Sequence, residues 1–203
     1  MSIKPNISPF ETTQKILTTL KEMLQDRCYK PINPNDFNTC ASSNEDLKYV
    51  AVKKCGSLIF VYFATDVKIP IKKAREYIEH MKAWSVNHAI IVYASQITPN
   101  ANAAFLNKKT ADFELFKAIE LYQNITKHQL VPHHSEIQTE QELKKIMNDC
   151  KVESKDKFPK YYTFDPVVKY FHWPVGTVVC IHRKLGGLQE PINYYRCVHE
   201  WQQ

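Results

Sequence analysis

Glycine is scarce in this chain, and its scarcity limits the kinds of site that the chain can build. Only 4 of the 203 residues are glycine, about 2% where proteins average roughly 7%. The four stand at positions 56, 176, 186 and 187, so no segment fits the G-x-G-x-x-G turn of a dinucleotide site or the G-x-x-x-x-G-K cradle of a P-loop. The sequence therefore predicts no glycine-rich phosphate loop, and we expect no cofactor.

Long hydrophobic runs are also missing. The longest, at positions 58–64, is far shorter than the ~20 residues that span a bilayer. The first five residues, MSIKP, contain no apolar core of a secretory signal. From these two features we expect an intracellular protein without a transmembrane helix.

Closely spaced cysteine pairs are absent as well. No C-x-x-C occurs among the six cysteines, which are spread along the whole chain at positions 28, 40, 55, 150, 180 and 197. In an intracellular chain of this size, cysteines at such spacing are typically small buried hydrophobic residues. We expect free thiols.

The first part of the chain has the pattern of a helix-covered sheet. Ser8-Pro9-Phe10-Glu11 is a capping box with proline at the first helical position, and predicts a helix that ends near Arg27. Two strands at 49–52 and 58–63 flank a Cys55-Gly56 turn and predict a hairpin. The second of these strands is apolar on both faces, which is typical of a central strand covered by helices.

A βαβ unit follows the hairpin. An amphipathic helix begins near Pro70, and a short buried strand follows at 89–93. This order predicts that the strands before and after the helix are parallel. Thr98 then caps another helix with Pro99 at its first position. The segment 113–125 fits a helix or a strand.

The last third of the chain predicts a second, smaller α/β domain. Thr139 to Glu142 form another capping box, and Asp165-Pro166 begins a short helix that ends near Phe171. Strands at 177–183 and 192–198 alternate around Gly186-Gly187. We therefore predict an α/β protein of two small domains, residues 1–127 with a helix-covered sheet and residues 128–203 with a small mixed sheet.

Positive charge is concentrated in the first of these domains. The whole chain has a formal net charge of +6, and residues 1–127 carry 17 basic and 12 acidic side chains against 10 and 9 in the remainder. Contact with nucleic acid is therefore more plausible for the first domain. Exposed lysines such as Lys72, Lys73 and Lys82 are equally typical of the solvated face of a helix.

Two metal-dependent alternatives are compatible with the residues. Asp66 and Lys68 follow the buried strand at 58–63, and Asp46 comes before the preceding strand. Two carboxylates with a lysine could hold Mg²⁺ and cleave a phosphodiester. The pairs Cys180 with His182 and Cys197 with His199 could instead bind one zinc ion from two neighbouring strands. Neither a G-x-S-x-G elbow nor a local cysteine signature occurs, so no nucleophilic active site is predicted.

Several segments, in order over nearly the whole chain, resemble the RNA polymerase subunit 5 family. This family supplies a small subunit shared among eukaryotic nuclear polymerases, and its C-terminal part corresponds to a small archaeal polymerase subunit. The matching segments are KEMLQDR at 21–27, AIIVY at 89–93 with ITP at 97–99, NITKH at 124–128 with LVPHH at 130–134, and DPVVKYF at 165–171 with GTVV at 176–179.

The resemblance implies a structural role without catalysis. It implies that residues 1–127 form a jaw beside downstream double-stranded DNA, which they contact without sequence specificity. Residues 128–203 would form an assembly domain that docks on the largest polymerase subunit. The DNA-proximal residues implied are Thr98, Pro99 and Asn100, with Lys72 and Lys73 as weaker candidates. Those implied in docking or its support are Pro132, Asp165, Pro166 and Gly176.

The chain also departs from the family pattern. The family has a basic, glycine-containing link where this chain reads HWPV at 172–175, and a Leu-Pro-Arg type of segment where it reads FPK at 158–160. Because archaeal versions lack the N-terminal part, the resemblance implies a divergent eukaryotic or large-DNA-virus member. The implied location is the nucleus in a cell, or a virus factory or virion for a virus.

Overall fold

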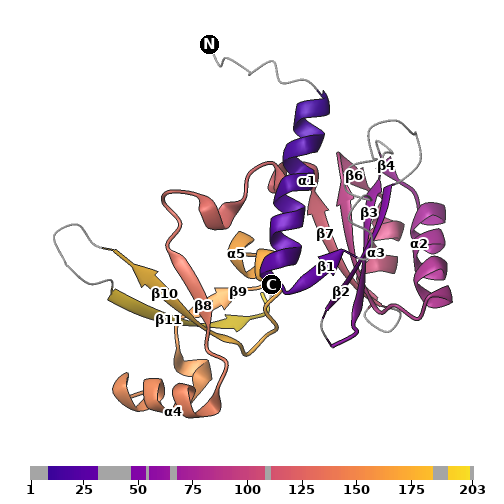
Figure 1. Ribbon diagram of the computed structural model, residues 1–203. Helices are drawn as coiled ribbons and strands as arrows, with labels where there is room; N and C mark the ends of the chain where they lie inside the picture. The colour runs from indigo at the N-terminus through magenta and orange to yellow at the C-terminus, as the bar shows by residue number, and fades with distance from the viewer. Residues whose placement is uncertain are drawn as a thin grey trace. The chain divides into compact units, whose positions relative to one another are not determined.

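The computed structural model describes residues 9–31, 47–53, 55–64, 68–107, 111–184 and 192–201, and the side chains of residues 9–12, 31 and 47–49 are outside this description. The chain divides into two compact units, residues 1–123 and residues 124–203 (Figure 1). Within the described ranges, every helix is too short or too polar to cross a membrane. The predicted α/β class with two small domains is confirmed.

The first unit is built around a five-stranded sheet in the order β1-β2-β3-β5-β7. Strands β2 and β3 are antiparallel, and β3, β5 and β7 are parallel. The predicted hairpin and βαβ unit are therefore both confirmed. The elements are α1 (Pro9–Asp26), β1 (Tyr29–Pro31), β2 (Leu47–Lys53), β3 (Leu58–Ala64), β4 (Lys68–Ile69), α2 (Ile71–Ala83), β5 (His88–Tyr93), β6 (Gln96–Ile97), α3 (Pro99–Phe105), β7 (Asp112–Lys117) and the 3-10 helix η2 (Ala118–Leu121).

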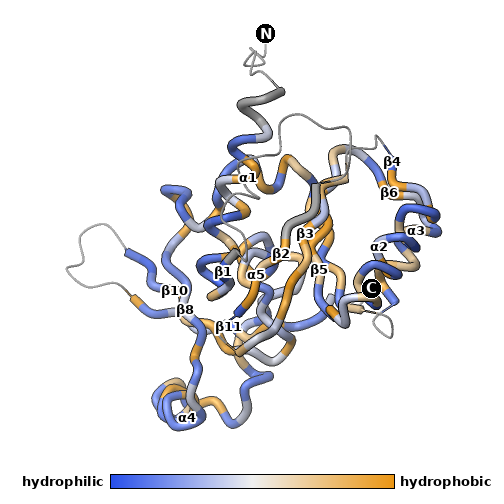
Figure 2. Tube along the Cα trace, turned by 45° about the vertical axis from the view of Figure 1, so that its right-hand side comes forward, coloured by the Kyte–Doolittle hydropathy of each residue, from blue (hydrophilic) through white to orange (hydrophobic). Residues whose placement is uncertain are grey.

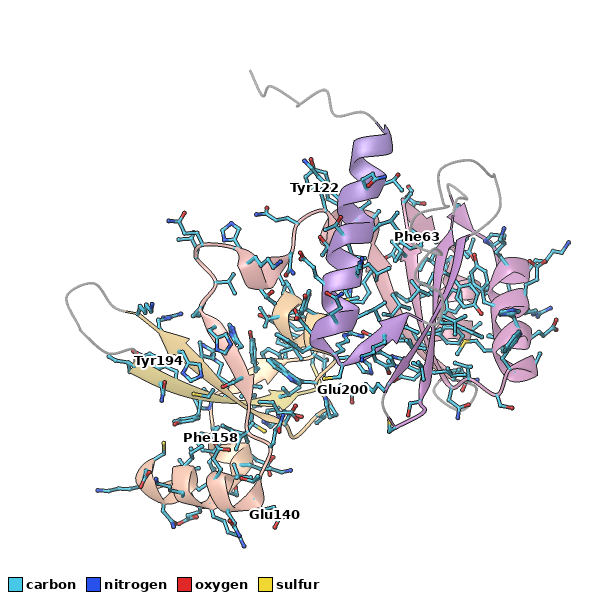
Figure 3. All side chains as sticks on the ribbon, viewed as in Figure 1. Phe63, Tyr122, Glu140, Phe158, Tyr194 and Glu200 are labelled. Atoms are coloured by element: carbon cyan, nitrogen blue, oxygen red, sulfur yellow. The ribbon has the colours of Figure 1, made fainter. Side chains whose placement is uncertain are left out.

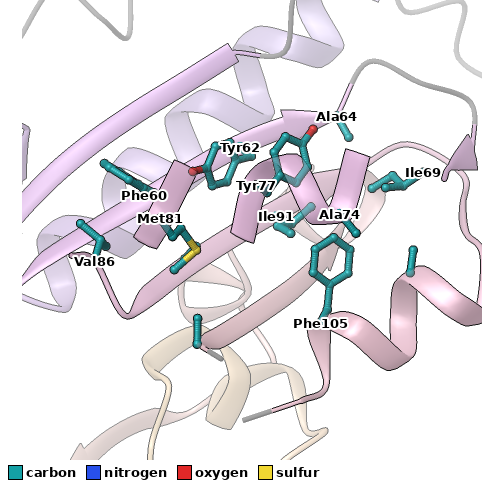
Figure 4. Packing of buried hydrophobic residues seen from close by; sticks show 13 residues of the cluster. Phe60, Tyr62, Ala64, Ile69, Ala74, Tyr77, Met81, Val86, Ile91 and Phe105 are labelled. Carbon is teal, nitrogen blue, oxygen red and sulfur yellow. The ribbon is translucent and has the colours of Figure 1, made fainter. Parts of the chain in front are cut away.

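Helices cover both faces of this sheet (Figure 1). Strand β3 lies at the centre of the strand order and is hydrophobic over most of its length, as is β5 (Figure 2). On the face covered by α2, the Tyr62 ring stacks on Tyr77 with centroids 4.4 Å apart, and Phe105 of α3 joins the same cluster (Figure 4). Ile59 and Val61 alternate with these residues along β3 and are buried on the other face.

The ambiguous segment 113–125 forms strand β7 and the 3-10 helix η2. Strand β7 pairs in register with β5, and Glu114 and Phe116 are the buried members of its alternating pattern. Helix η2 ends at Leu121, whose side chain is buried. The segment forms a strand because β5 offers it an edge with which to pair, and this pairing satisfies its backbone N–H and C=O groups. The periodicity of the sequence contains no information on such pairing.

The second unit contains a four-stranded mixed sheet in the order β8-β10-β11-β9. Strand β10 pairs antiparallel with β8 and β11, while β9 is parallel to β11. A mixed sheet was predicted for this part of the chain. The elements are η3 (Ile125–Lys127), β8 (His133–Glu136), α4 (Glu140–Asp149), η4 (Lys155–Lys157), β9 (Lys160–Tyr162), α5 (Pro166–Phe171), β10 (Val178–Arg183) and β11 (Ile192–His199).

Each face of this small sheet has its own core. Val179 and Val198 pack with Val167 and Val168 of α5 on one face. On the other face, Val178 and Cys197 pack with Ile146 of α4 and with Phe158, which Figure 3 shows between the sheet and α4. Successive residues of β10 and β11 therefore serve opposite cores.

The compact units divide four residues before the boundary predicted from the sequence, which lay after Lys127. The Asn124 side chain accepts the Thr126 N–H at 2.9 Å and so begins η3. Its Nδ2 also donates to the Tyr170 hydroxyl of α5 at 3.1 Å. These two bonds attach the segment that begins at Asn124 to the core of the second unit.

A buried charge network fixes the end of α1 to the last strand of the first unit. Arg27 directly follows α1, and its guanidinium donates two hydrogen bonds of 2.7 and 2.8 Å to the Glu114 carboxylate of β7. Each of the two residues is 7% exposed. His88 Nε2 lies 2.7 Å from the same carboxylate. Such bidentate geometry is what makes a buried ion pair tolerable.

We expect Arg27→Met to destabilise the first unit by about 3–5 kcal/mol, because it leaves the Glu114 charge buried without its main compensating cation. The double variant Arg27→Met/Glu114→Leu removes both charges and should recover part of that loss. Amide hydrogen exchange of β3 and β5 measures the opening free energy of this unit in the full chain. A double variant less stable than the single one would contradict the assigned role of this ion pair.

Candidate functional site

The second unit carries a groove of about 470 Å³ on the sheet face that is covered by α5. Its walls come from β8, β10 and β11, from the start of α5, and from the segment that follows η3. The lining includes Leu130, Val131, Pro132, His134, Tyr161, Asp165, Pro166, Ile181, Arg183, Tyr194 and Arg196. This mixture of apolar, aromatic and a few charged groups is typical of a site that binds another molecule.

The polar side of the groove is formed by His134 and Tyr161. The Pro132 carbonyl can only accept, so His134 Nδ1 carries the proton of their 2.7 Å bond. His134 Nε2 is then left to accept the Tyr161 hydroxyl at 3.2 Å. Burial lowers the pKa of His134 and raises that of Tyr161, and the nearby Asp165 carboxylate raises the pKa of Tyr161 further. Both side chains are therefore neutral at physiological pH.

Asp165 and Pro166 shape one wall of the groove by starting helix α5. The Asp165 Oδ1 accepts the Val167 N–H at 2.9 Å, and Pro166 occupies the first helical position. This confirms the cap expected from the Asp-Pro pair. The helix ends at Phe171, and the next residue, His172, adopts the left-handed conformation with φ of 54°. Local sequence thus determines the start of the helix that bounds the groove.

The rim of the groove is cationic and aromatic. The Arg183 guanidinium carbon lies 5.6 Å from the Tyr194 ring centroid, and that of Arg196 lies 5.7 Å from the Tyr161 ring. All three rim residues, Arg183, Tyr194 and Arg196, are exposed; Figure 3 labels Tyr194 on β11. Leu130, also on the lining, is 84% exposed. Arginine and tyrosine are enriched in protein-binding surfaces.

Three of the four residues expected in docking or its support line this groove. They are Pro132, Asp165 and Pro166. Gly176 is not among the lining residues; it has φ of +88° and donates its N–H to the Val198 carbonyl at 2.8 Å. Its place in the fold is the turn that leads into β10, where a positive φ favours glycine.

The rim residues Arg183, Tyr194 and Arg196 were not predicted from the sequence as part of a site. Their signal is the alternation of Ile192, Tyr194 and Arg196 on one strand, which places a tyrosine and an arginine on the same face. The register that pairs Ile181 with Tyr194 and with His134 then brings three strands together at the groove. Register is a long-range property, and it could not be obtained from the alternation alone.

The expected DNA-proximal residues lie at one edge of the first unit. Strands β4 and β6 pair in parallel, Ile69 with Ile97, so that α2 and α3 begin at the same edge. Thr98 Oγ1 accepts the Ala101 N–H at 3.3 Å, which confirms the predicted cap. Pro99, Asn100 and Lys72 are exposed, whereas Lys73 is half-buried. Because β4 and β6 are parallel neighbours, Lys72 and the turn at 98–100, which follow them, lie at the same edge of the unit.

The structure bears on only one of the two metal-dependent alternatives, the zinc site. Asp46 and Asp66 lie outside the described residues, and Lys68 is exposed on β4, so the nuclease hypothesis stays untested. For zinc, the register pairs His182 with Asn193, six residues from His199 on the same strand, about 20 Å away. His182 is also hydrogen-bonded through both ring nitrogens, to Ser135 and Asn193 at 2.9 Å each. Cys180, His182, Cys197 and His199 therefore do not form one site.

Comparison with known proteins identifies the family. The family model described as RNA polymerase Rpb5, C-terminal domain, matches residues 123–198. The "DNA-directed RNA polymerases I, II, and III subunit rpabc1" of Dictyostelium discoideum is 34% identical over 91% of this chain and 96% of its own length. The chain belongs to the RNA polymerase subunit 5 family.

Further relatives of this subunit 5 family member come from nematodes. The RPABC1 subunit of Caenorhabditis briggsae is 30% identical over 91% of this chain and 83% of its own length. That of Caenorhabditis elegans is 33% identical over 67% and 64%. A solved structure, EndoMS in apo form, aligns with 56% of this chain and 48% of its own at 12% identity and a TM-score of 0.33, too low to bear on function.

The family match includes the whole groove of this subunit 5 chain. Its limits, 123 and 198, contain every lining residue from Ile125 to Arg196. The match also begins within one residue of the division between the two compact units. His199 and Trp201, at the end of β11 and beyond it, lie outside the match.

The stability of the second unit should fall in mild acid because of His134. Its folded pKa lies below the ordinary value of 6.5, so the unfolded chain takes up the proton first. The stabilisation is therefore complete above pH 6.5 and is lost as the pH falls from there through the folded pKa. His133, His182 and Asp165 also face this group.

His134→Gln should weaken that pH dependence while keeping an acceptor for Tyr161. Urea unfolding followed through the amide signals of β10, at about pH 7.5 and about pH 5.5, measures the difference. Equal losses in the variant and the parent chain would show that another group is responsible.

Proposed function

We propose that this chain is a non-catalytic structural subunit of a multisubunit DNA-directed RNA polymerase. The observation that carries the proposal is the 34% identity to the Dictyostelium polymerase subunit, which extends over nearly the full length of both chains. Residues 128–203 are its polymerase-assembly domain and residues 1–127 its jaw domain. The corresponding location is the nucleus in a cellular host, or a virus factory or virion in a viral one.

We further propose that the groove of the second unit receives the largest polymerase subunit. Three arguments support this. The groove contains Pro132, Asp165 and Pro166, which the resemblance assigns to docking or its support. It combines an exposed leucine with apolar walls, so its coverage would remove apolar surface from water. Its cationic rim, Arg183 and Arg196, would favour a partner segment with acidic residues.

The jaw domain is proposed to lie beside downstream double-stranded DNA. Lys72 and the turn Thr98-Pro99-Asn100 follow the paired strands β4 and β6 and so face the same edge of the unit. The N–H groups of Thr98 and Ala101 are already bonded within the protein, to Ile69 and Thr98. Contact with DNA there would rest on lysine charge and exposed side chains, and would be independent of base sequence.

The docking proposal predicts that the tagged full chain recovers the largest polymerase subunit from its host. Arg183→Glu/Arg196→Glu should reduce that recovery by about tenfold or more, because arginines at a covered interface often contribute about 2 kcal/mol or more. The matched control is Lys144→Glu/Lys145→Glu, with the same charge change at exposed positions of α4.

Two outcomes would contradict this proposal. Recovery of the tagged chain free of large polymerase subunits would remove the structural role. Equal recovery with the groove variant and the α4 variant would leave the role intact and reject the groove as the docking site.

The DNA proposal predicts a change in salt dependence for Lys72→Gln. In the assembled polymerase, the slope of log affinity for a downstream duplex against log salt concentration should become shallower by about one unit, since one phosphate contact is lost. Lys82→Gln is the control, because Lys82 is exposed on the same helix ten residues later, about 15 Å away. An unchanged slope for Lys72→Gln would contradict contact at this residue.

A further inference from the structure

Three side chains with metal-binding atoms meet at the C-terminal end of β11. The Asp156 carboxylate, the Cys197 thiol and the His199 imidazole each offer one atom, and these atoms all lie within 4.8 Å of one another. We propose that they form a zinc site. The set differs from the four residues considered in the sequence, because Asp156 replaces Cys180 and His182.

Strand geometry explains why these residues meet. Cys197 and His199 are two residues apart on β11 and therefore project from the same face. Asp156 belongs to η4, just before β9, which is the parallel neighbour of β11. The Cys197 N–H donates to the Pro159 carbonyl at 3.0 Å, and this bond holds the segment that carries Asp156 against the end of the strand.

An independent observation points to a ligand at this place. His199 Nε2 is buried and, among the described residues, has no hydrogen-bond partner. A buried polar atom in that condition has lost its bonds to water without compensation, and a native structure normally satisfies it. A metal ion bound to this nitrogen would do so.

The donor set suits zinc better than the harder cations. Thiolate, imidazole and carboxylate are the usual zinc ligands, at bond lengths of about 2.3, 2.0–2.1 and 2.0–2.2 Å, whereas Mg²⁺ and Ca²⁺ prefer oxygen alone. In a tetrahedron of those bonds, the ligand atoms are roughly 3.3–3.8 Å apart. Since the three atoms lie within 4.8 Å of one another, reaching these separations shortens any pair distance by about 1.5 Å at most.

Access and burial are also compatible with a bound ion. Cys197 is fully buried beside Val178 and Phe158, whereas Asp156 is exposed. The ion would enter from the carboxylate side, and water would take the fourth position that three protein ligands leave open. The neighbouring Lys155 and Lys157 are exposed, and the Lys155 ammonium lies beside Gly176.

Asp156 and Cys197 lie inside the matched family domain, and His199 lies just outside it. The family match ends at residue 198, one position before His199. A zinc ion would tie η4 to β11 and so connect a loop to the core strand whose opposite face packs under α5. Its expected effect is to stabilise the second unit.

The test measures zinc binding by the purified full chain after chelator treatment, with a chromophoric chelator as competitor. We expect one zinc ion per chain. Asp156→Asn and His199→Ala should each weaken binding by at least about tenfold, since even changes beside metal ligands cost about 10–100-fold. Zinc should also raise the Tm of the parent chain and leave that of His199→Ala nearly unchanged.

Two control variants and a spectroscopic measurement test whether zinc binds at these three residues. Asp149→Asn changes an exposed carboxylate, and His182→Ala removes a histidine elsewhere on the same sheet face; both should bind zinc like the parent chain. Co²⁺ in place of zinc should give a thiolate-to-metal charge-transfer band that Cys197→Ser abolishes. Absence of stoichiometric zinc in the parent chain, or equal zinc affinity in His199→Ala, would overturn the proposal.

Discussion

The antiparallel register of β10 and β11 is the constraint on which the second unit depends. Side chains alternate across the sheet, so each step along these strands changes the core that a residue serves. Val179 and Val198 pack under α5 and support the groove, while Val178 and Cys197 pack under α4 and Phe158. A slip of one residue would exchange these two sets of residues. It would disrupt the core under α5, which supports the groove, and the core under α4 at the same time.

Local features of this fold could be predicted from the sequence, since they depend on a few neighbouring residues. Thr98 and Asp165 each cap a helix as the Thr-Pro and Asp-Pro pairs indicate, and Gly56 has the positive φ that a tight hairpin turn requires. The apolar pattern of β3 likewise predicted its central place in the sheet.

Features that depend on pairing between distant strands could not be obtained in the same way. The sequence of β7 fits a helix or a strand, and its pairing with β5 selects the strand. The groove rim and the grouping of Asp156 with Cys197 and His199 follow from strand register and from the parallel strand β9. The four-residue zinc set failed for the same reason, because two Cys-x-His pairs on neighbouring strands can be offset along the strand direction.

The ion pair between Arg27 and Glu114 also has a consequence for how the chain is made. Its two members are 87 residues apart, so closing the loop between them carries a large entropic cost, and contacts of this separation slow folding. During synthesis, Glu114 leaves the ribosome long after α1 has done so. The end of α1 can therefore form its ion pair only after the last strand of the sheet has been synthesised. The first unit completes its core only when nearly all of it has been translated.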